Sequence, residues 1–264
     1  LIPSAPLGLL YDVDPGFPLQ TDAVNPGPRV GFAFDVFGNG KTSVRGGYGI
    51  SYSPLVGQIS GQNSPPFAVD LNTSNVGPLS DPQRFIDVPY GKPVDPSHAV
   101  FPRSVTVRGS WAGHIVVPYS QDLNLTLEQQ VRTDTTVQLS YVGTLGRHEA
   151  TMPEQNPAVY VPGGSTSSNI DARRIYGPAF TSIRGWATDS SPAYHAIQVT
   201  LRRRFARGVS YSLAYAFSKA IDESSRGDAA NDWGIQNPFD RRGNRGLGDT
   251  DIRNRVVGSW VWEL

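Results

Sequence analysis

The sequence contains no cysteine. This absence excludes disulfide bonds, thiolate nucleophiles and cysteine-ligated metals. The sequence also lacks any apolar run close to the roughly 20 residues that a membrane-spanning helix needs. A chain of this kind can therefore cross a membrane only as β-strands.

Neither sign of charge is in excess, because 23 Lys and Arg residues balance 23 Asp and Glu residues. A nucleic-acid-binding domain needs a surplus of basic residues for its phosphate contacts. Nucleic acid is therefore not expected as a partner.

A secretory signal is missing too. Residues 1–10 are apolar, but Pro3, Pro6 and Gly8 interrupt them, and they lack the charged start and the continuous apolar core of a signal peptide. At the other end, the apolar run 256–264 stops in what its pattern indicates is the middle of a strand. We therefore expect that further sequence precedes and follows these 264 residues.

Strict alternation of apolar and polar residues is the dominant pattern in the chain. In residues 209–217 every second side chain is large and apolar, and those between are Ser or Ala. A period of two predicts a β-strand with one apolar face. The same pattern predicts hairpins at about 29–53, 119–144 and 193–219, and a last strand from about residue 253, which makes about seven strands.

The connections between these strands differ greatly in length. Each hairpin closes through three or four residues, whereas residues 54–118, 145–192 and 219–252 form long segments rich in Pro, Gly, Ser, Asn and Asp. Long loops without regular structure are uncommon in compact soluble domains. Short periplasmic turns and long extracellular loops are typical of transmembrane barrels.

Aromatic residues lie at both ends of the expected strands. Phe37 and Phe205 immediately precede short turns, and a second group lies next to the long loops. That second group consists of Tyr52, Tyr119, Tyr141, Tyr194 and Phe217. Rings at these two levels are typical of the aromatic girdles that lie at the lipid headgroups.

These patterns predict an all-β fold, a partial antiparallel transmembrane β-barrel that occupies residues 1–264 as a single domain. An antiparallel sheet with one buried face also alternates apolar and polar residues. A soluble β-sandwich that serves as a binding module is therefore the alternative outside the membrane. The sorting of loop lengths and rings favours the barrel.

Residues 25–42 (NPGPRVGFAFDVFGNGKT), followed by residues 44–50, resemble a hairpin of the large TonB-dependent receptors of the Oar-like type. Residues 119–125, 191–196 and 215–222 agree with that resemblance. The resemblance implies a barrel of about 22 strands that is filled by a plug domain and energised through TonB, with a carboxypeptidase-regulatory-like domain ahead of the plug. None of these other parts has a counterpart in this sequence, so no functional residue can be carried over from them.

No catalytic signature is present, and we expect neither an enzyme nor a cofactor. Residues 38–42 end like a phosphate-binding loop, but Asp35 replaces the first glycine of that motif, and the segment joins two strands. The four histidines lack metal-ligand spacing, so no metal site is expected.

Two groups of residues, both rich in arginine, are the candidate functional residues. Arg202 and Arg204 alternate with Arg203, so that the first two are expected to face the lumen and its plug, while Arg203 lies at the periplasmic end of the lipid-facing surface. The loop from 222 to 251 combines aromatic and basic side chains that could hold an anionic or sugar-like ligand. The residues expected to contact ligand are Trp233, Phe239, Arg241, Arg242 and Arg245. The alternative for this loop is a solvated segment that is structured by its own ion pairs.

The sequence therefore predicts a wall section of an outer-membrane transporter that imports a scarce nutrient such as a siderophore, cobalamin, a glycan or a peptide. Its expected partners are outer-membrane lipid, its own plug domain, the TonB system and the small nutrient. A passive porin or adhesin-like barrel is the alternative within the outer membrane.

Overall fold

The computed structural model describes residues 24–53, 80, 104–110, 116–178, 180–224 and 235–263, with the backbone alone for 104–110, 185 and 186. The chain consists of two compact units. The larger comprises residues 20–55, 115–153 and 187–264, and the smaller comprises 1–19, 56–114 and 154–186. Among the residues so described, no helix has both the length and the apolar character needed to cross a membrane.

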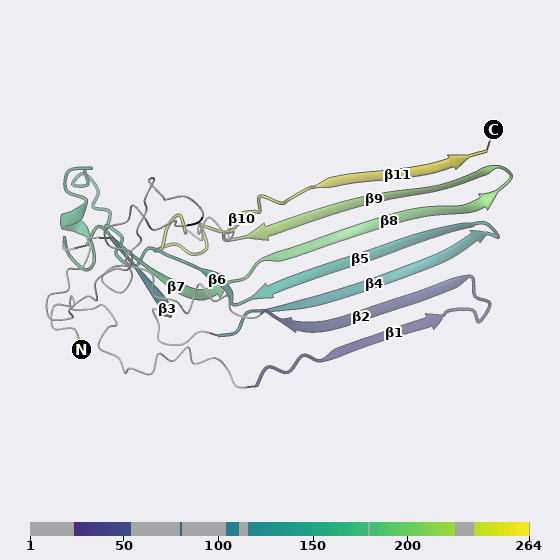
Figure 1. Cartoon of the computed structure of the whole chain (residues 1–264), viewed down its shortest axis with the longest axis horizontal. Coiled ribbons are helices and arrows are strands. Elements are labelled where there is room, and N and C mark those ends of the chain that lie inside the picture. Colours follow the sequence, from purple (N-terminus) through teal and green to yellow (C-terminus); the bar gives the residue numbers. More distant parts are fainter. Residues whose placement is uncertain are drawn as a thin grey trace. The chain divides into compact units, whose positions relative to one another are not determined.

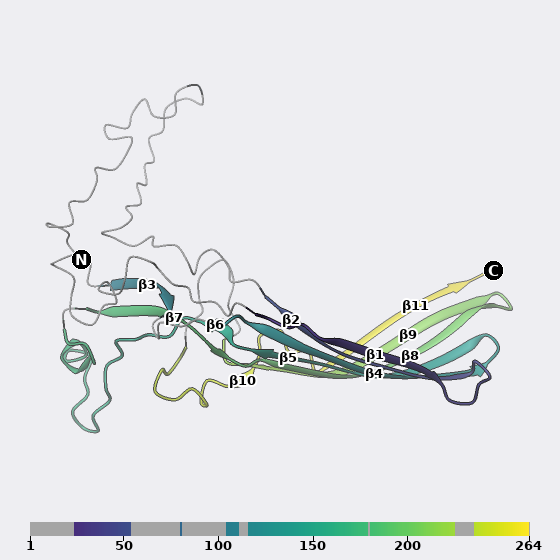
Figure 2. The same ribbon diagram turned by 90° about the horizontal axis from the view of Figure 1, so that it is seen from below.

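An 8-stranded antiparallel sheet dominates the larger unit. Its long strands run side by side in chain order (Figure 1), and Figure 2 shows the same sheet edge-on as a thin curved layer. They are β1 (Arg29–Asp35), β2 (Thr42–Tyr52), β4 (Tyr119–Arg132), β5 (Thr135–Arg147), β8 (Ala193–Ala206), β9 (Val209–Asp222) and β11 (Asn254–Trp262). The two-residue β10 (Gly246–Leu247) pairs with the end of β9 beside β11. Within the described residues, the outer edges of β1 and β11 pair with no further strand, so the sheet is open at both edges.

Local turn chemistry forms the hairpins at one end of this sheet. Arg207 and Gly208 between β8 and β9 both have positive φ, at 52° and 77°, which gives the mirror-image turn that suits the twist of paired strands. Between β1 and β2, the Asp35 carboxylate accepts the Gly40 N–H at 2.7 Å. Residues 38–42 are therefore a hairpin loop and not the start of a phosphate-binding helix. We call this end of the sheet, which carries the three short turns, the short-turn end.

Strand register sorts the side chains of the sheet onto two chemically different faces. One row of cross-strand partners is apolar from edge to edge and defines the apolar face: Phe34, Val44, Leu127, Leu139, Val199, Tyr215 and Val256. The row one residue away is small and hydrophilic and defines the polar face: Ala33, Arg45, Thr126, Ser140, Gln198, Ala216 and Arg255. An apolar band outside and polar residues inside are typical of transmembrane barrels.

The apolar face is exposed and not packed into a core. Phe34 is 61% and Val256 is 74% exposed. The buried apolar side chains of the described residues lie mainly outside the long strands: Met152, Phe180, Ile183, Ala196 and Ile235. A continuous exposed apolar surface of this kind needs an apolar partner, and lipid supplies it.

One girdle residue lies on the other face from the one expected. Tyr194 pairs with Thr144 and Ala220, and this register places it on the polar face. Tyr141 and Phe217 lie in the same cross-strand row on the apolar face. Proximity to a long loop predicted the level of Tyr194 along its strand, but only the register decides which side it faces.

The long connections contain secondary structure that alternation did not predict. In the smaller unit, β3 (Ser104–Ser110) runs parallel to the first half of β7 (Ser182–Ser190), and a 3₁₀ helix spans Asp171–Arg173. In the larger unit, the second half of β7 pairs antiparallel with β6 (Glu149–Thr151).

Side-chain hydrogen bonds to the backbone order the smaller unit. The fully buried Asn156 donates to the Phe180 carbonyl at 3.0 Å and accepts the Tyr176 N–H at 2.8 Å. The Glu154 carboxylate accepts the Ile183 N–H at 2.8 Å. Such contacts join residues that are distant in the sequence, and they leave no periodic pattern.

Candidate functional site

A polar cleft of about 230 Å³ lies at the short-turn end of the polar face. Strands β4, β5 and β8 and the β4–β5 turn supply its walls. The residues that line this inner cleft are Glu128, Asp134, Thr136, Gln138, Thr200, Arg202 and Arg204. Both arginines that the sequence assigned to the lumen therefore contribute to a single cleft.

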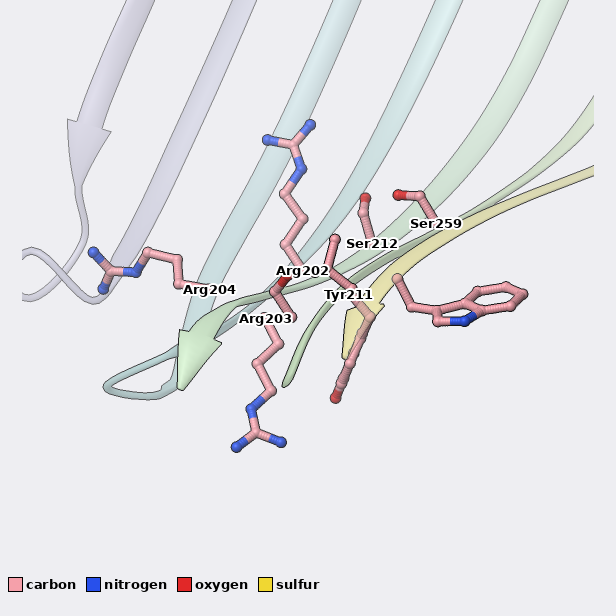
Figure 3. Close-up of a pocket in the computed structure, with 9 residues that line it drawn as sticks. Arg202, Arg203, Arg204, Tyr211, Ser212 and Ser259 are labelled. Atoms are coloured by element: carbon pink, nitrogen blue, oxygen red, sulfur yellow. The ribbon is translucent and has the colours of Figure 1, made fainter. Parts of the chain in front are cut away.

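The three consecutive arginines of β8 do not point the same way. Figure 3 shows Arg202 on the same side of the sheet as Ser212 and Ser259, with Arg203 on the opposite side beside Tyr211. Strand register agrees, because Arg202 pairs with Ser212 and Arg203 pairs with Tyr211. Strand alternation thus separates Arg203 from the inner cleft.

The carboxylates around the inner cleft already have cationic partners. Glu128 pairs with Arg45 across β2 and β4, and Asp134 pairs with Arg203 at 3.0 Å. A hydrogen bond from Thr135, and then Arg203, lower the pKa of Asp134, and together they outweigh the opposing effect of desolvation. Each of the two carboxylates is therefore paired with an arginine that does not line the inner cleft.

Arg202 and Arg204 have no carboxylate partner in the part of the chain that the structure describes. Arg204 donates to the neutral Thr133 carbonyl at 2.7 Å, and both side chains belong to exposed residues. Neither guanidinium forms an ion pair with the Glu128 or Asp134 carboxylate that lines the same cleft. The arrangement is suited to binding an anionic group, because a guanidinium binds carboxylates through paired hydrogen bonds.

A second polar cluster lies at the opposite end of the larger unit, among its long loops. The Glu223 carboxylate follows β9 and accepts hydrogen bonds from the Ser190 hydroxyl at 2.6 Å and the Ser191 N–H at 2.7 Å. Arg245 donates to the same carboxylate and to the Ser191 carbonyl, each at 2.7 Å. This contact ties the segment around Arg245 to the segment that precedes β8.

A neighbouring ion pair extends this cluster. Arg241 binds Asp189 at 2.5 Å, and Asp189 also accepts a hydrogen bond from the Thr151 hydroxyl at 2.6 Å. The Arg241 Nη1 atom is buried and has no hydrogen-bond partner among the described residues. We call Asp189, Ser190, Ser191, Glu223, Arg241 and Arg245 together the outer-loop cluster.

The structure separates the five residues that the sequence proposed as ligand contacts. Arg241 and Arg245 are engaged by carboxylates of the outer-loop cluster, whereas Phe239, 59% exposed, and Arg242 are exposed to solvent. Trp233 lies outside the described residues. Sequence reasoning did not select Asp189 and Glu223, since no local pattern connects them to arginines 52 and 22 positions away.

The loop that carries these arginines is shaped by its own amide side chains. Asn244 donates to the backbone carbonyls of Asn237 and Asp240 at 2.9 Å each. Asn237 in turn accepts the Phe239 N–H at 3.0 Å, and Asp240 accepts the Gly243 N–H at 2.9 Å. Asn and Asp favour turns through such side-chain bonds to the backbone.

We predict that acidic pH breaks the contacts of the Glu223 carboxylate and so weakens the outer-loop cluster. Burial raises the pKa of Glu223, but the bonds from Ser190, Ser191 and Arg245 outweigh this effect, so the pKa lies below its ordinary value of 4.5. A folded-state pKa below the unfolded value gives stability that is complete above the unfolded pKa and is lost as the pH falls through the folded pKa. Hydrogen exchange at residues 235–251, corrected for intrinsic rates, should therefore accelerate in acid relative to the β8–β9 hairpin. Equal protection of the loop in acid and at neutral pH would contradict the prediction.

The two faces, the open sheet and the sorting of short turns and long loops define the class of protein as the wall of a transmembrane β-barrel. Residues 12–264 match the outer membrane beta barrel domain family, and the chain belongs to it. It is therefore an outer-membrane protein domain, of a kind that is typically non-enzymatic. This membership excludes the soluble β-sandwich.

Comparison with solved structures gives a distant likeness to the outer membrane transporter YddB from Escherichia coli. The identity is 13% and the TM-score is 0.52, with 89% of this chain and 26% of that chain covered. The likeness shows the fold alone, and the chain spans about a quarter of the length of that transporter. Comparison with curated protein sequences gives no match.

Proposed function

We propose that this chain is a wall section of a TonB-dependent outer-membrane transporter, whose lumen holds a plug domain and which imports a scarce nutrient. The observation that carries the proposal is the pair Arg202 and Arg204 in the inner cleft, neither of which has a carboxylate partner among the described residues. The positive charge of each arginine in the inner cleft attracts an acidic group of a partner that enters the lumen. A plug domain packed inside the barrel is a partner that can supply such groups.

Two further observations support the same proposal. The sequence resembles TonB-dependent receptors of the Oar-like type over most of its length, and the fold is similar to that of a protein described as an outer membrane transporter. The outer-loop cluster holds the loop of residues 235–251 against β7, so Phe239 and Arg242 remain available for an anionic or sugar-like nutrient.

Reversing the charge of the inner cleft tests the proposal. In the complete barrel protein, Arg202→Glu with Arg204→Glu should loosen the plug, because like charges would replace the attraction between arginine and carboxylate. We expect faster protease cleavage of the plug and a lower rate of nutrient uptake. Arg207→Glu is the matched control, since Arg207 lies in the β8–β9 turn and does not line the inner cleft.

A passive porin or adhesin-like barrel is the second candidate, because a porin lumen is also polar. It would contain no plug for these arginines to bind. Unchanged protease sensitivity and unchanged uptake in the double variant, with the barrel folded, would contradict plug docking and favour the passive barrel.

A further inference from the structure

The apolar face is bounded by polar residues at both of its ends. Towards the long loops, the row with His195 and Lys219 limits it, and at the short-turn end the row with Arg203, Tyr211 and Trp260 does so. Nine residues of β8 run from His195 to Arg203, which agrees with the roughly 9–11 residues that a tilted strand needs to cross a bilayer. The two rows therefore lie at the two headgroup levels.

Basic side chains gather at the outer of these two levels. His195 and Lys219 are direct cross-strand partners on β8 and β9, so their Cβ atoms lie within about 5 Å. Arg253 joins them, because its guanidinium lies over the Phe217 ring, 5.8 Å from the centroid. Phe217 precedes Lys219 by two residues and shares its face of the sheet.

The ring of His195 is held in place by a neighbour. The Tyr141 hydroxyl lies 2.7 Å from His195 Nδ1, and the two rings are stacked at 6.1 Å. Gly143 makes this contact possible: it is the cross-strand partner of His195, and a Cβ atom there would lie 3.2 Å from the Tyr141 hydroxyl. When that hydroxyl donates to Nδ1, the neutral imidazole carries its proton on Nε2 and offers a free donor.

The charges at this level are poorly neutralised by the protein. Lys219 is exposed and has no hydrogen bond or ion pair within the described part of the chain. Arg253 is 4.0 Å from Asp251, whose carboxylate already accepts the Ala220 N–H at 2.7 Å. At the inner level the situation is reversed, because Arg203 is paired with Asp134 at 3.0 Å.

We infer that His195, Lys219 and Arg253 form a binding site for a phosphate of lipopolysaccharide in the outer leaflet. Only the outer leaflet of the outer membrane is built from this phosphorylated glycolipid. At the outer rim of the apolar face, Lys219 has no ion pair among the described residues and Arg253 lies 4.0 Å from the Asp251 carboxylate, whereas Arg203 at the inner rim is paired at 3.0 Å. The phosphate lies between Lys219 and Arg253 and accepts the Nε2–H of His195, while the acyl chains cover Phe217 and Ile197. The inference rests on the outer-membrane location and not on transport.

The test measures binding of fluorescent lipopolysaccharide to the complete barrel protein in detergent. Lys219→Gln with Arg253→Gln should weaken binding about 10- to 30-fold, since each cation near an anionic lipid surface contributes about fivefold. Arg255→Gln is the control for Arg253→Gln, because it removes one positive charge only two residues further along the chain, from a β11 residue that lies on the polar face. Heat-modifiable gel migration verifies that each variant is folded.

A competition experiment on the unmodified protein gives a second measurement that needs no variant. Lipid A with both phosphates should displace the fluorescent lipid, whereas dephosphorylated lipid A and phosphatidylglycerol should displace it at least tenfold less well. The inference is overturned if the dephosphorylated lipid or the phospholipid competes equally well. It is equally overturned if the double variant binds as tightly as the unmodified protein, or if Arg255→Gln weakens binding to the same extent.

Discussion

Replacement of Val199 by arginine is expected to destabilise the barrel by about 2–4 kcal/mol in a bilayer. Val199 lies on the apolar face, in the row that joins Leu139 to Tyr215. That row is midway between the two polar boundaries, so a guanidinium there would have to enter the hydrocarbon or pull water and headgroups towards it. Denaturant unfolding of the complete barrel in lipid vesicles measures the free energy of unfolding.

Gln198→Arg is the control for this prediction. Gln198 is the preceding residue, pairs with Ser140 and Ala216 and faces the polar side. The same side chain introduced there should change the free energy of unfolding by less than about 1 kcal/mol, because it meets water and polar groups. Equal losses for the two variants would show that the apolar face is not the lipid-facing one.

Replacement of Glu223 by glutamine is expected to free the loop of residues 235–251 from its contact with β7. The Glu223 carboxylate is only 12% exposed and accepts hydrogen bonds from three donors. Hydrogen bonds to a charged group contribute about 1.5–3 kcal/mol each when buried, and Arg245 is 39% exposed, so we expect a local loss of about 2 kcal/mol. Hydrogen exchange of residues 235–251 should accelerate about 30-fold.

Glu149→Gln is the matched control for the loop. Burial alone raises the pKa of Glu149, and no hydrogen bond or ion pair holds its side chain in the described residues. Removing its charge should therefore leave exchange in the loop unchanged, and it should not lower the stability of the fold at neutral pH. The interpretation of the outer-loop cluster would be wrong if Glu223→Gln left protection of the loop intact.

The long strands could be predicted from sequence because their signal is local and repeated. Residues such as Leu213 and Tyr215 occur every second position over a whole strand, and the turns at Gly40 and Gly208 carry their own backbone requirements. β3, β6 and β7 could not be predicted in the same way. Their partners lie far away in the chain, and buried polar side chains such as Asn156 order their surroundings.

The inner cleft was within reach of sequence reasoning, because alternation alone separates Arg202 from Arg203. The ion pairs that neutralise its two carboxylates could not be predicted from the sequence, because Glu128 and Arg45 are 83 residues apart and Asp134 and Arg203 are 69 apart. The same limit applies to Arg241 and Arg245. Whether an arginine binds a ligand or a carboxylate of its own chain depends on tertiary contacts that composition does not reveal.

The measurement that tests the central claim most directly is a cysteine scan of residues 196–201 in the membrane-inserted barrel. This chain contributes no other cysteine, so spin labels can be placed singly along β8. We predict that positions 197, 199 and 201 collide mainly with oxygen dissolved in lipid, and that positions 196, 198 and 200 collide mainly with a water-soluble nickel reagent. Absence of this alternation, or its reversal, would contradict the assignment of the apolar face to lipid.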